Sequence, residues 1–196
     1  MILYCATSNP GKLREFQLAA GHFGVRDAAI EVLPGLERIP APDESGTTFE
    51  ENAILKAVGY SRHTSGHVFA DDSGLAVDAL GGAPGVFSAR YAGRGSTDAA
   101  NRALLMENMR GRADRGARFI CVVALARQSE LLGTFTGVVE GLLLDHERGS
   151  GGFGYDPLFF FPPLGRTLAE IDEARKMDVS HRGKALAAMF RFLGLI

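Results

Sequence analysis

An Asp-Asp-Ser-Gly sequence at residues 71–74 is the densest group of side chains able to do chemistry. It follows the apolar run Val68 to Ala70, so we expect the two carboxylates where a strand ends. Successive side chains of a strand point to opposite faces, which predicts that only one of the pair reaches a given site. Carboxylates in such a place suit Mg²⁺, which binds one or two of them together with substrate phosphates. A plain Asp-Ser-Gly turn is the alternative interpretation.

The loop Thr7 to Lys12 has the residue types of an anion site at a helix start. Asn9 fits the N-cap and Pro10 the first helical position, so Ser8, Asn9 and Lys12 would surround exposed N–H groups. Such N–H groups attract anions. The spacing is not that of a Walker loop. An ordinary capped helix with a solvated Lys12 explains the same residues.

An acidic segment precedes the next expected helix. Thr48 with Glu51, or Thr47 with Glu50, forms a capping box, and capping alone explains both glutamates. Glu44 lies before this helix and has no such duty. It is free to bind a metal, although an isolated surface glutamate is ordinarily only solvated.

The glycine-rich segment 149–157 matches G-x-G-x-x-G, but a charged loop precedes it and a strand follows. That order is the reverse of a dinucleotide fingerprint, which excludes the NAD interpretation. Phe153 and Tyr155 offer flat surfaces for stacking on a base, and Asp156 offers an acceptor for ring N–H groups. Ordinary core aromatics would give the same pattern.

The start of the last helix carries two potential cations. Ser180 is expected to cap this helix, which places His181 and Arg182 in its first turn. The positive end of the helix disfavours each charge there by roughly 0.3–1 kcal/mol, so we expect a negative or electron-rich group opposite. Solvated surface residues remain the alternative.

Hydrophobic periodicity around these motifs predicts an α/β fold. Strands are expected at Met1 to Ala6, Val68 to Ala70, Phe119 to Ala126, Leu131 to Val139 and Leu158 to Phe161. Helices are expected at Pro10 to Ala20, Phe49 to Ser61, Asp98 to Met109 and His181 to Leu193. A short polar stretch joins the strands expected at 119–126 and 131–139, which indicates an antiparallel hairpin and hence a mixed sheet.

The composition sets limits on the class of protein. The chain has 196 residues, 46% hydrophobic and 22% charged, as expected for one compact domain. A net charge of -2 gives no general attraction to nucleic acid or to an anionic membrane, and no run approaches the ~20 apolar residues of a membrane span. Cys5 and Cys121 lie in apolar runs, and no signal peptide is apparent, so we expect buried thiols in the cytoplasm.

Four motifs together resemble the non-canonical purine nucleoside triphosphate pyrophosphatases, the inosine triphosphatase or Ham1-like family. They are TSNPGK at 7–12, ADDSGLAVDALGGAPGVFSARYAG at 70–93, GGFGYDP at 151–157 and SHRGKAL at 180–186. The resemblance implies one domain over 1–196, an elongated mixed sheet flanked by helices, and two lobes with the active site in the cleft between them. It also implies a homodimer that uses Mg²⁺ to cleave ITP, dITP and XTP to the monophosphate and pyrophosphate, which cleanses the nucleotide pool.

The resemblance also assigns roles to individual residues. Asp72 becomes the proton acceptor and metal carboxylate, with Glu44, or alternatively Glu51, as a further ligand, and Ser73 becomes a substrate contact. The triphosphate loop becomes Thr7, Ser8, Asn9, Pro10, Gly11 and Lys12, with Ser8 standing where the family commonly has Gly. The nucleotide pocket becomes Phe153, Gly154, Tyr155, Asp156, Lys176, His181 and Arg182.

The chemistry expected from these roles is attack of water on the α-phosphorus, with pyrophosphate leaving. Donors from His181, Arg182 or Lys176 would favour a 6-oxo purine over adenine. Two other functions stay open: a Maf-like pyrophosphatase for other modified nucleotides, and a nucleotide-binding regulator without catalysis. A nucleic-acid-binding module is the least favoured, because no long basic stripe is present.

Overall fold

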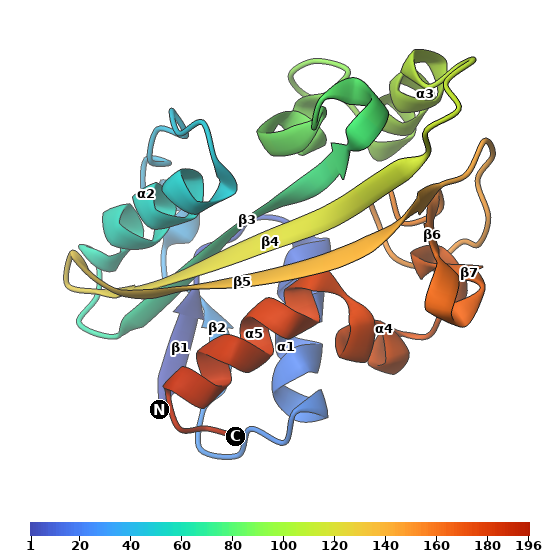
Figure 1. Ribbon diagram of the computed structural model, residues 1–196. Coiled ribbons are helices and arrows are strands. Elements are labelled where there is room, and N and C mark those ends of the chain that lie inside the picture. The colour runs from blue at the N-terminus through green and yellow to red at the C-terminus, as the bar shows by residue number, and fades with distance from the viewer.

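A mixed seven-stranded sheet with the strand order β2-β1-β3-β4-β5-β6-β7 is the frame of the computed structural model, which describes residues 1–196 (Figure 1). The strands are β1 Ile2–Cys5, β2 Ala29–Val32, β3 His67–Val77, β4 Gly116–Arg127, β5 Glu130–Leu143, β6 Phe159–Phe161 and β7 Arg166–Thr167. The helices are α1 Pro10–His22, α2 Phe49–Ser61, α3 Asp98–Asn108, α4 Glu173–Val179 and α5 His181–Phe192. The mixed α/β class is as predicted.

Each expected helix and strand is present, and the capping residues explain where several begin. The Asn9 side chain accepts from the Lys12 backbone N–H, with Pro10 as the first residue of α1. At α2 the capping box is formed by Thr48 and Glu51, which decides between the two alternatives. Ser180 caps α5 as predicted. Strands β2 and β7 and helix α4 are short elements that the periodicity did not predict.

Strand β3 is longer than predicted, and this changes the position of the paired aspartates. The expectation that a strand ends at Ala70 is wrong, because β3 continues to Val77. β4 pairs with it without interruption from Val68↔Ala126 to Val77↔Ala117, so the backbone of the polar segment is satisfied by the ladder. Asp71 and Asp72 therefore lie in mid-strand.

The sheet topology opens one edge of β3 at these aspartates. β1 runs parallel to both β2 and β3, but its pairing with β3 ends at Cys5↔Phe69. The chain then leaves the sheet through the loop before α1. The next two strands, β2 and β3, lie on opposite sides of β1, so the direction in which strands are added to the sheet changes here. Ligands of open α/β sheets bind at such switch points, beyond the carboxyl ends of the strands.

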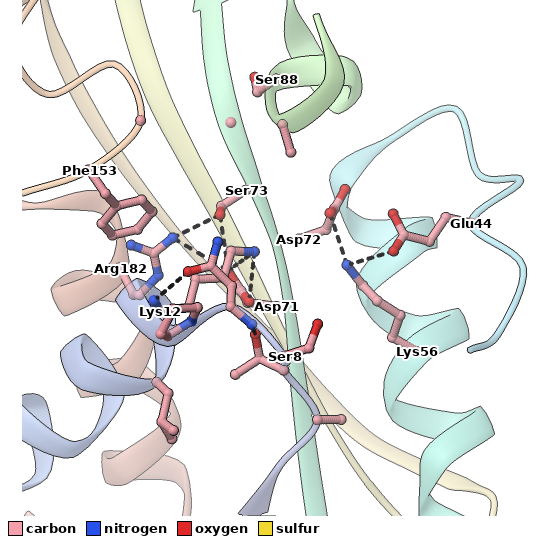
Figure 2. A pocket seen from close by; sticks show the side chains of 18 of the residues that line it. Ser8, Lys12, Glu44, Lys56, Asp71, Asp72, Ser73, Ser88, Phe153 and Arg182 are labelled. Carbon is pink, nitrogen blue, oxygen red and sulfur yellow. Dashed lines mark hydrogen bonds and ion pairs between the residues drawn. The ribbon is translucent and has the colours of Figure 1, made fainter. Parts of the chain in front are cut away.

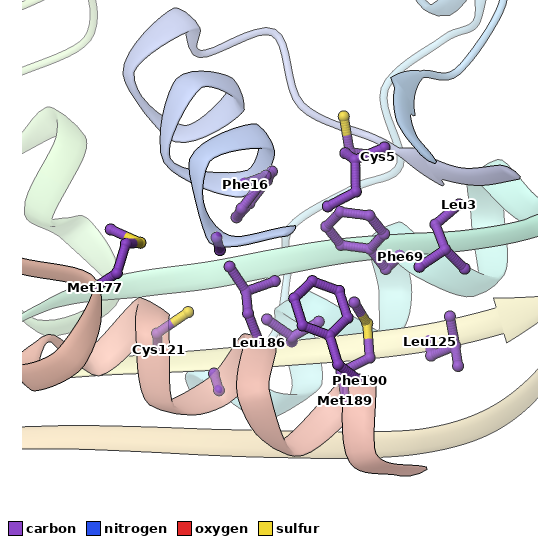
Figure 3. Close-up of a cluster of buried hydrophobic side chains, with 14 residues drawn as sticks. Leu3, Cys5, Phe16, Phe69, Cys121, Leu125, Met177, Leu186, Met189 and Phe190 are labelled. Carbon is purple, nitrogen blue, oxygen red and sulfur yellow. The ribbon is translucent and has the colours of Figure 1, made fainter. Parts of the chain in front are cut away.

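Helices cover both faces of the central strands, which buries alternate residues of β3 on opposite sides. Phe69 packs with Phe16 of α1 and Phe190 of α5 (Figure 3). Its neighbours Val68 and Ala70 pack instead against α2. A third cluster, at the far end of the sheet, joins α3 to β4, β5 and β6. The three clusters make β3 a rigid support for the polar side chains between them.

The two cysteines are buried free thiols, as predicted. Burial raises the pKa of Cys121 to about 12. None of the helices combines the length and apolar character that crossing a membrane requires.

Candidate active site

A cavity of about 780 Å³ opens along the free edge of β3. It extends from the loop before α1, past the middle of β3, to the 153–156 loop and the start of α5. The structure brings together in its wall fifteen of the predicted site residues: Thr7, Ser8, Asn9, Pro10, Lys12, Glu44, Asp72, Ser73, Phe153, Gly154, Tyr155, Asp156, Lys176, His181 and Arg182. Gly11 is outside this wall but contacts it, since a Cβ there would lie 2.9 Å from the Phe153 ring. Glu51 is taken up by the capping box.

Asp71 and Asp72 point to different sides of β3, as the strand period requires, yet both line the same cavity. Figure 2 shows Asp71 with Lys12 and Arg182, and Asp72 turned toward Lys56 and Glu44. The expectation that only one of the two reaches the site is therefore wrong. The reason is the open edge of β3, around which side chains from both faces reach one space.

On the α1 side, the Asp71 carboxylate forms ion pairs with two cationic side chains. Lys12 Nζ lies 2.9 Å from Asp71 Oδ2, and Arg182 Nη2 lies 3.6 Å from the same oxygen. Ser73 Oγ donates to Asp71 and accepts from Arg182. Although burial alone would raise it, Lys12 and Arg182 hold the pKa of Asp71 well below its usual range. Asp71 is therefore ionised and holds Lys12 at the mouth of the phosphate-type loop.

On the α2 side, two carboxylates converge on one ammonium group. Lys56 Nζ lies 3.0 Å from Asp72 Oδ1 and 3.7 Å from Glu44 Oε1. Asn52, one turn before Lys56 on α2, donates to Asp72 over 3.4 Å and exchanges two hydrogen bonds with Gly46. Asn52 thereby ties the loop that carries Glu44 to the aspartate on β3.

Asp72 and Lys56 have the electrostatics of a proton-transfer site. Burial raises the pKa of Asp72 above its ordinary value, and the Lys56 ammonium opposes that rise. Burial also disfavours the charge of Lys56, but Asp72, Asp71 and Glu44 together raise its pKa. A buried carboxylate whose pKa is shifted toward neutrality is a suitable general base.

The carboxylates of Asp72 and Glu44 suit a hard divalent cation whose other ligands are water and phosphate oxygens. No group of three or more His, Cys, Asp or Glu side chains is arranged to hold a metal. Asp72 and Glu44 nonetheless already share one cation, the Lys56 ammonium (Figure 2). Two carboxylates completed by phosphate oxygens and water is the usual protein contribution to a Mg²⁺ site.

The other end of the cavity contains a buried network of alternating charges. Lys176 Nζ lies 2.6 Å from both Glu15 Oε1 and Asp156 Oδ2. Arg182 is also paired with Glu15. Although burial raises it, Arg182 and Lys176 lower the pKa of Glu15, so it is ionised. The negative group expected opposite the start of α5 is thus the protein's own Glu15.

His181 is not a cation, contrary to the expectation for the first turn of α5. Burial, with Arg182 and Lys176 nearby, lowers its pKa well below 6.5, and its ring stacks on Phe119 with a centroid separation of 4.7 Å. His181 Nδ1 and Arg182 Nε are buried side-chain nitrogens without a hydrogen-bond partner. Such orphaned polar groups are costly, and both residues line the cavity, which marks a place for a polar ligand.

The two aromatic residues of the glycine-rich loop have different surroundings. The Phe153 ring centroid lies 5.4 Å from Arg182 Cζ and 5.2 Å from Lys176 Nζ. Tyr155 belongs instead to the core cluster at the far end of the sheet, and its hydroxyl donates to Ser88 O over 2.8 Å. Phe153 therefore lies in the wall of the cavity beside two cations, whereas Tyr155 is mainly a core residue. Asp156 accepts from the Phe153 backbone N–H over 2.9 Å and so fixes this loop.

Three charged residues of the site were not predicted. Glu15 lies one turn after Lys12 on the buried face of α1, where a charge among apolar neighbours was the available signal. Lys56 follows Asn52 by one turn on the inner face of α2, which is a similar signal. Arg90 lies in a 3₁₀ segment, Gly85–Arg90, whose position no periodicity could give.

Comparisons with known proteins identify the family and the fold of the chain. The model of the Ham1 family matches residues 3–192. The chain belongs to the Ham1 family. A dITP/XTP pyrophosphatase of Acidobacterium capsulatum is 50% identical over 198 residues, covering 96% of each chain. A solved HAM1 protein from Coxiella burnetii has a TM-score of 0.88 at 37% identity, with both chains fully covered. The solved Staphylococcus aureus Ham1 protein has a TM-score of 0.86 at 37% identity, covering 99% of this chain and 98% of that one. The resemblance predicted from four motifs is confirmed, and it extends over nearly the whole chain.

Proposed function

We propose that the protein hydrolyses non-canonical purine nucleoside triphosphates, namely ITP, dITP and XTP, to the monophosphate and pyrophosphate. One observation carries the choice of substrate. His181 and Arg182 each have a buried nitrogen without a partner, and both residues line the same cavity as the carboxylate and ammonium groups of a phosphate-transfer site. Relatives that match over nearly their whole length are named dITP/XTP pyrophosphatases, which supports the same class of substrate.

The phosphate end of the reaction belongs to β3, α1 and α2. Lys12 and the N–H groups at the start of α1 would bind the triphosphate and stabilise charge that develops on the leaving pyrophosphate. Asp72 would accept a proton from the water that attacks the α-phosphorus. Lys56 adjoins Asp72 and would neutralise phosphate charge as the carboxylate takes up that proton.

We further propose that Mg²⁺ is the cofactor and that Asp72 and Glu44 hold it. When bound, such an ion supplies charge neutralisation on the phosphates and activation of water. Asn52 would keep these two carboxylates together, because it contacts both Asp72 and the backbone beside Glu44.

Base selection belongs to the 153–156 loop and the start of α5. The Arg182 Nε–H group is a donor only, so it complements the 6-oxo group of hypoxanthine or xanthine. The 6-amino group of adenine would leave this buried donor unpaired, which discriminates strongly. Phe153 would stack on the base, and the Glu15–Lys176–Asp156 network would hold the polar groups in place.

The assembly and location are also proposals. The Ham1 resemblance supports a homodimer, for which light scattering would give twice the mass of one chain. It equally supports a single catalytic domain over 1–196. The buried free thiols support a cytoplasmic location.

The reaction is tested with a panel of nucleotides in H₂¹⁸O, with and without Mg²⁺. We expect pyrophosphate release from ITP, dITP and XTP well above that from ATP and GTP, only with the metal, and ¹⁸O in the monophosphate. Label in orthophosphate or pyrophosphate would contradict attack at the α-phosphorus. Preference for modified pyrimidines would favour the Maf-like alternative, and binding without turnover would favour a regulator.

A further inference from the structure

Arg90 lines the cavity from a part of the chain that the proposed mechanism does not use. It ends the 3₁₀ segment η3, Gly85–Arg90, and lines the same cavity as Glu44 of the loop before α2. Arg90 Nη1 lies 3.8 Å from Glu44 Oε2. Both side chains are about one-third exposed, at 37% for Arg90 and 36% for Glu44, so the pair borders the cavity and solvent.

The backbone that carries Arg90 is held on both sides by one buried amide. Asn101 of α3 donates to Ala89 O over 3.2 Å and accepts from Ala92 N over 2.8 Å. Asn101 is only 2% exposed. A side chain that is one-third exposed, on a backbone fixed one residue before it and two residues after it, is positioned rather than merely solvated.

A second anchor joins the same segment to β3. Ser88 Oγ accepts from Leu75 N over 2.9 Å and donates to Gly85 O over 2.7 Å. Gly74 is required here, because a Cβ at this residue would lie 2.3 Å from Ser88 Oγ. The segment with Arg90 is therefore fixed to the strand that carries Asp72, two residues before Gly74.

The charges near Asp72 are balanced before any ligand arrives. Asp71, Asp72 and Glu44 provide three negative charges, and Lys12, Lys56 and Arg90 provide three positive ones. Arg182, which also contacts Asp71, is paired with Glu15. A cation that takes up Asp72 and Glu44 deprives Lys56 and Arg90 of their carboxylate partners. A triphosphate arriving with that cation supplies new anionic partners at the same place. Arg90 is then the free guanidinium nearest to Glu44, and a guanidinium binds phosphate oxygens in a bidentate manner.

We propose that Arg90 is a further triphosphate-binding residue, held by Glu44 in the free enzyme and transferred to phosphate oxygens when Glu44 binds the metal. This inference rests on the proposed function, since it takes the metal to arrive with a polyphosphate. The Arg90–Glu44 contact has two possible roles, phosphate binding and a purely structural link, and they predict different affinities for phosphate. An Arg90–Glu44 contact that only joined the two sides of the cavity would add nothing to phosphate binding.

The test is calorimetric titration with magnesium pyrophosphate, which needs neither a purine nor turnover. In Arg90→Gln we expect pyrophosphate and ITP to bind about tenfold to a hundredfold more weakly, the loss typical of one charged hydrogen-bonding group. Arg90→Lys should recover part of the affinity, because lysine keeps the positive charge but lacks the bidentate hydrogen bonding of the guanidinium. The affinity for inosine, which has no phosphate, should not change.

Arg94→Gln is the matched control, because it removes the same charge from an exposed site four residues further along the same loop. It should bind pyrophosphate as the wild type does. Unchanged or tighter pyrophosphate binding in Arg90→Gln, or no pyrophosphate binding by the wild type, would overturn the role of Arg90. Failure of the wild type to hydrolyse ITP would instead overturn the proposed function, and the pyrophosphate titration would still judge Arg90.

Discussion

Lys56 Nζ lies 3.0 Å from Asp72 Oδ1, so the carboxylate best placed to act on water is already neutralised by an internal cation. The ammonium contacts Glu44 as well, which makes it the common partner of both carboxylates. A metal that bound these two residues would have to displace it. The ion pairs therefore hold the two carboxylates close together, and a substrate that arrives with its own cation would replace the ammonium.

Asp72→Asn should abolish turnover while leaving the fold and nucleotide binding largely intact. Loss of a general base costs about 10²–10⁴-fold in rate, and loss of a metal ligand adds to this. Rates of pyrophosphate release from ITP measure the effect. Asp78→Asn is a suitable control, since Asp78 directly follows β3 and pairs with the partly exposed Arg118 outside the cavity. An Asp72→Asn enzyme with near-normal rates would remove Asp72 from the mechanism.

The protonation of Asp72 should depend on Lys56. Burial raises the pKa of Asp72 above the model-peptide value of 3.8, and Lys56 holds it down. Lys56→Met removes the positive charge and keeps much of the side-chain volume, so the pKa of Asp72 should rise further. A ¹³C NMR titration of the side-chain carboxyl, without nucleotide or metal, measures this shift. An equal or lower pKa in Lys56→Met would show that the ion pair does not control Asp72.

The Lys12→Ala substitution should weaken the binding of ITP much more than the binding of inosine. Lys12 is held by Asp71 at the mouth of the loop before α1, beside the first N–H groups of that helix. Truncation removes one charged contact to the phosphates, worth about tenfold or more in affinity. Equilibrium titration with the two ligands gives the comparison. Lys184→Ala, an exposed lysine on α5, serves as the control, and equal losses for ITP and inosine would show that Lys12 does not touch the phosphates.

Much of the secondary structure could be predicted because its signals are local. Helix α2 has both predicted ends, since Thr48 and Glu51 form a capping box directly before an amphipathic run. The β4–β5 hairpin follows from two apolar runs and a short polar connection. Strand β3 was predicted too short because Asp-Asp-Ser-Gly has the composition of a turn. Only pairing with β4, about 50 residues later in the chain, keeps it extended.

The charged network of the base pocket depends on contacts that no local pattern contains. Glu15 and Lys176 are separated by 161 residues, and Glu15 and Arg182 by 167. Motif resemblance found Lys176 and Arg182 but not Glu15, which lies outside the motifs. Periodicity placed Glu15 on a helix, yet the need for a buried anion there follows only once α1, α4 and α5 pack together.

Asp156→Ala should lower kcat/KM for ITP far more than for ATP. Asp156 holds both Lys176 Nζ and the Phe153 backbone N–H, so its loss loosens the polar groups that discriminate between the bases. Unpaired buried groups cost about 1–3 kcal/mol each, or roughly tenfold to a hundredfold in selectivity. Tyr155→Phe is the comparison, since it removes only the hydroxyl contact to Ser88 and should leave the ITP-to-ATP ratio unchanged. If Asp156→Ala kept the wild-type ratio of kcat/KM for ITP to kcat/KM for ATP, the selective contacts would lie elsewhere. Lys176 would then be the next residue to test.

His181 should make the protein less stable as the pH falls below 6.5. Its folded-state pKa lies well below 6.5 because the ring is buried near Arg182 and Lys176, whereas the unfolded chain titrates at the ordinary value. Below pH 6.5 the histidine is therefore protonated in the unfolded state but not in the folded state. The free energy of unfolding then decreases by up to about 1.4 kcal/mol per pH unit. The carboxylates with lowered pKa values, Glu15 and Asp71, lose their stabilising charge only at more acidic pH. Burial raises the pKa values of Asp72 and Asp156, which opposes this slope, so the difference between the wild type and a His181 variant isolates the contribution of the histidine.

Denaturant unfolding at several pH values from 6.5 to about 5 measures the slope. His181→Gln should be less stable at neutral pH, because it loses the stacking on Phe119, but its stability should depend much less on pH. A small slope should remain from His67, whose pKa burial also lowers. His63→Gln, at an exposed residue, should keep the full slope of the wild type. If His181→Gln kept that slope as well, His181 would be protonated in the folded protein, and a neutral ring in the base pocket would have to be abandoned.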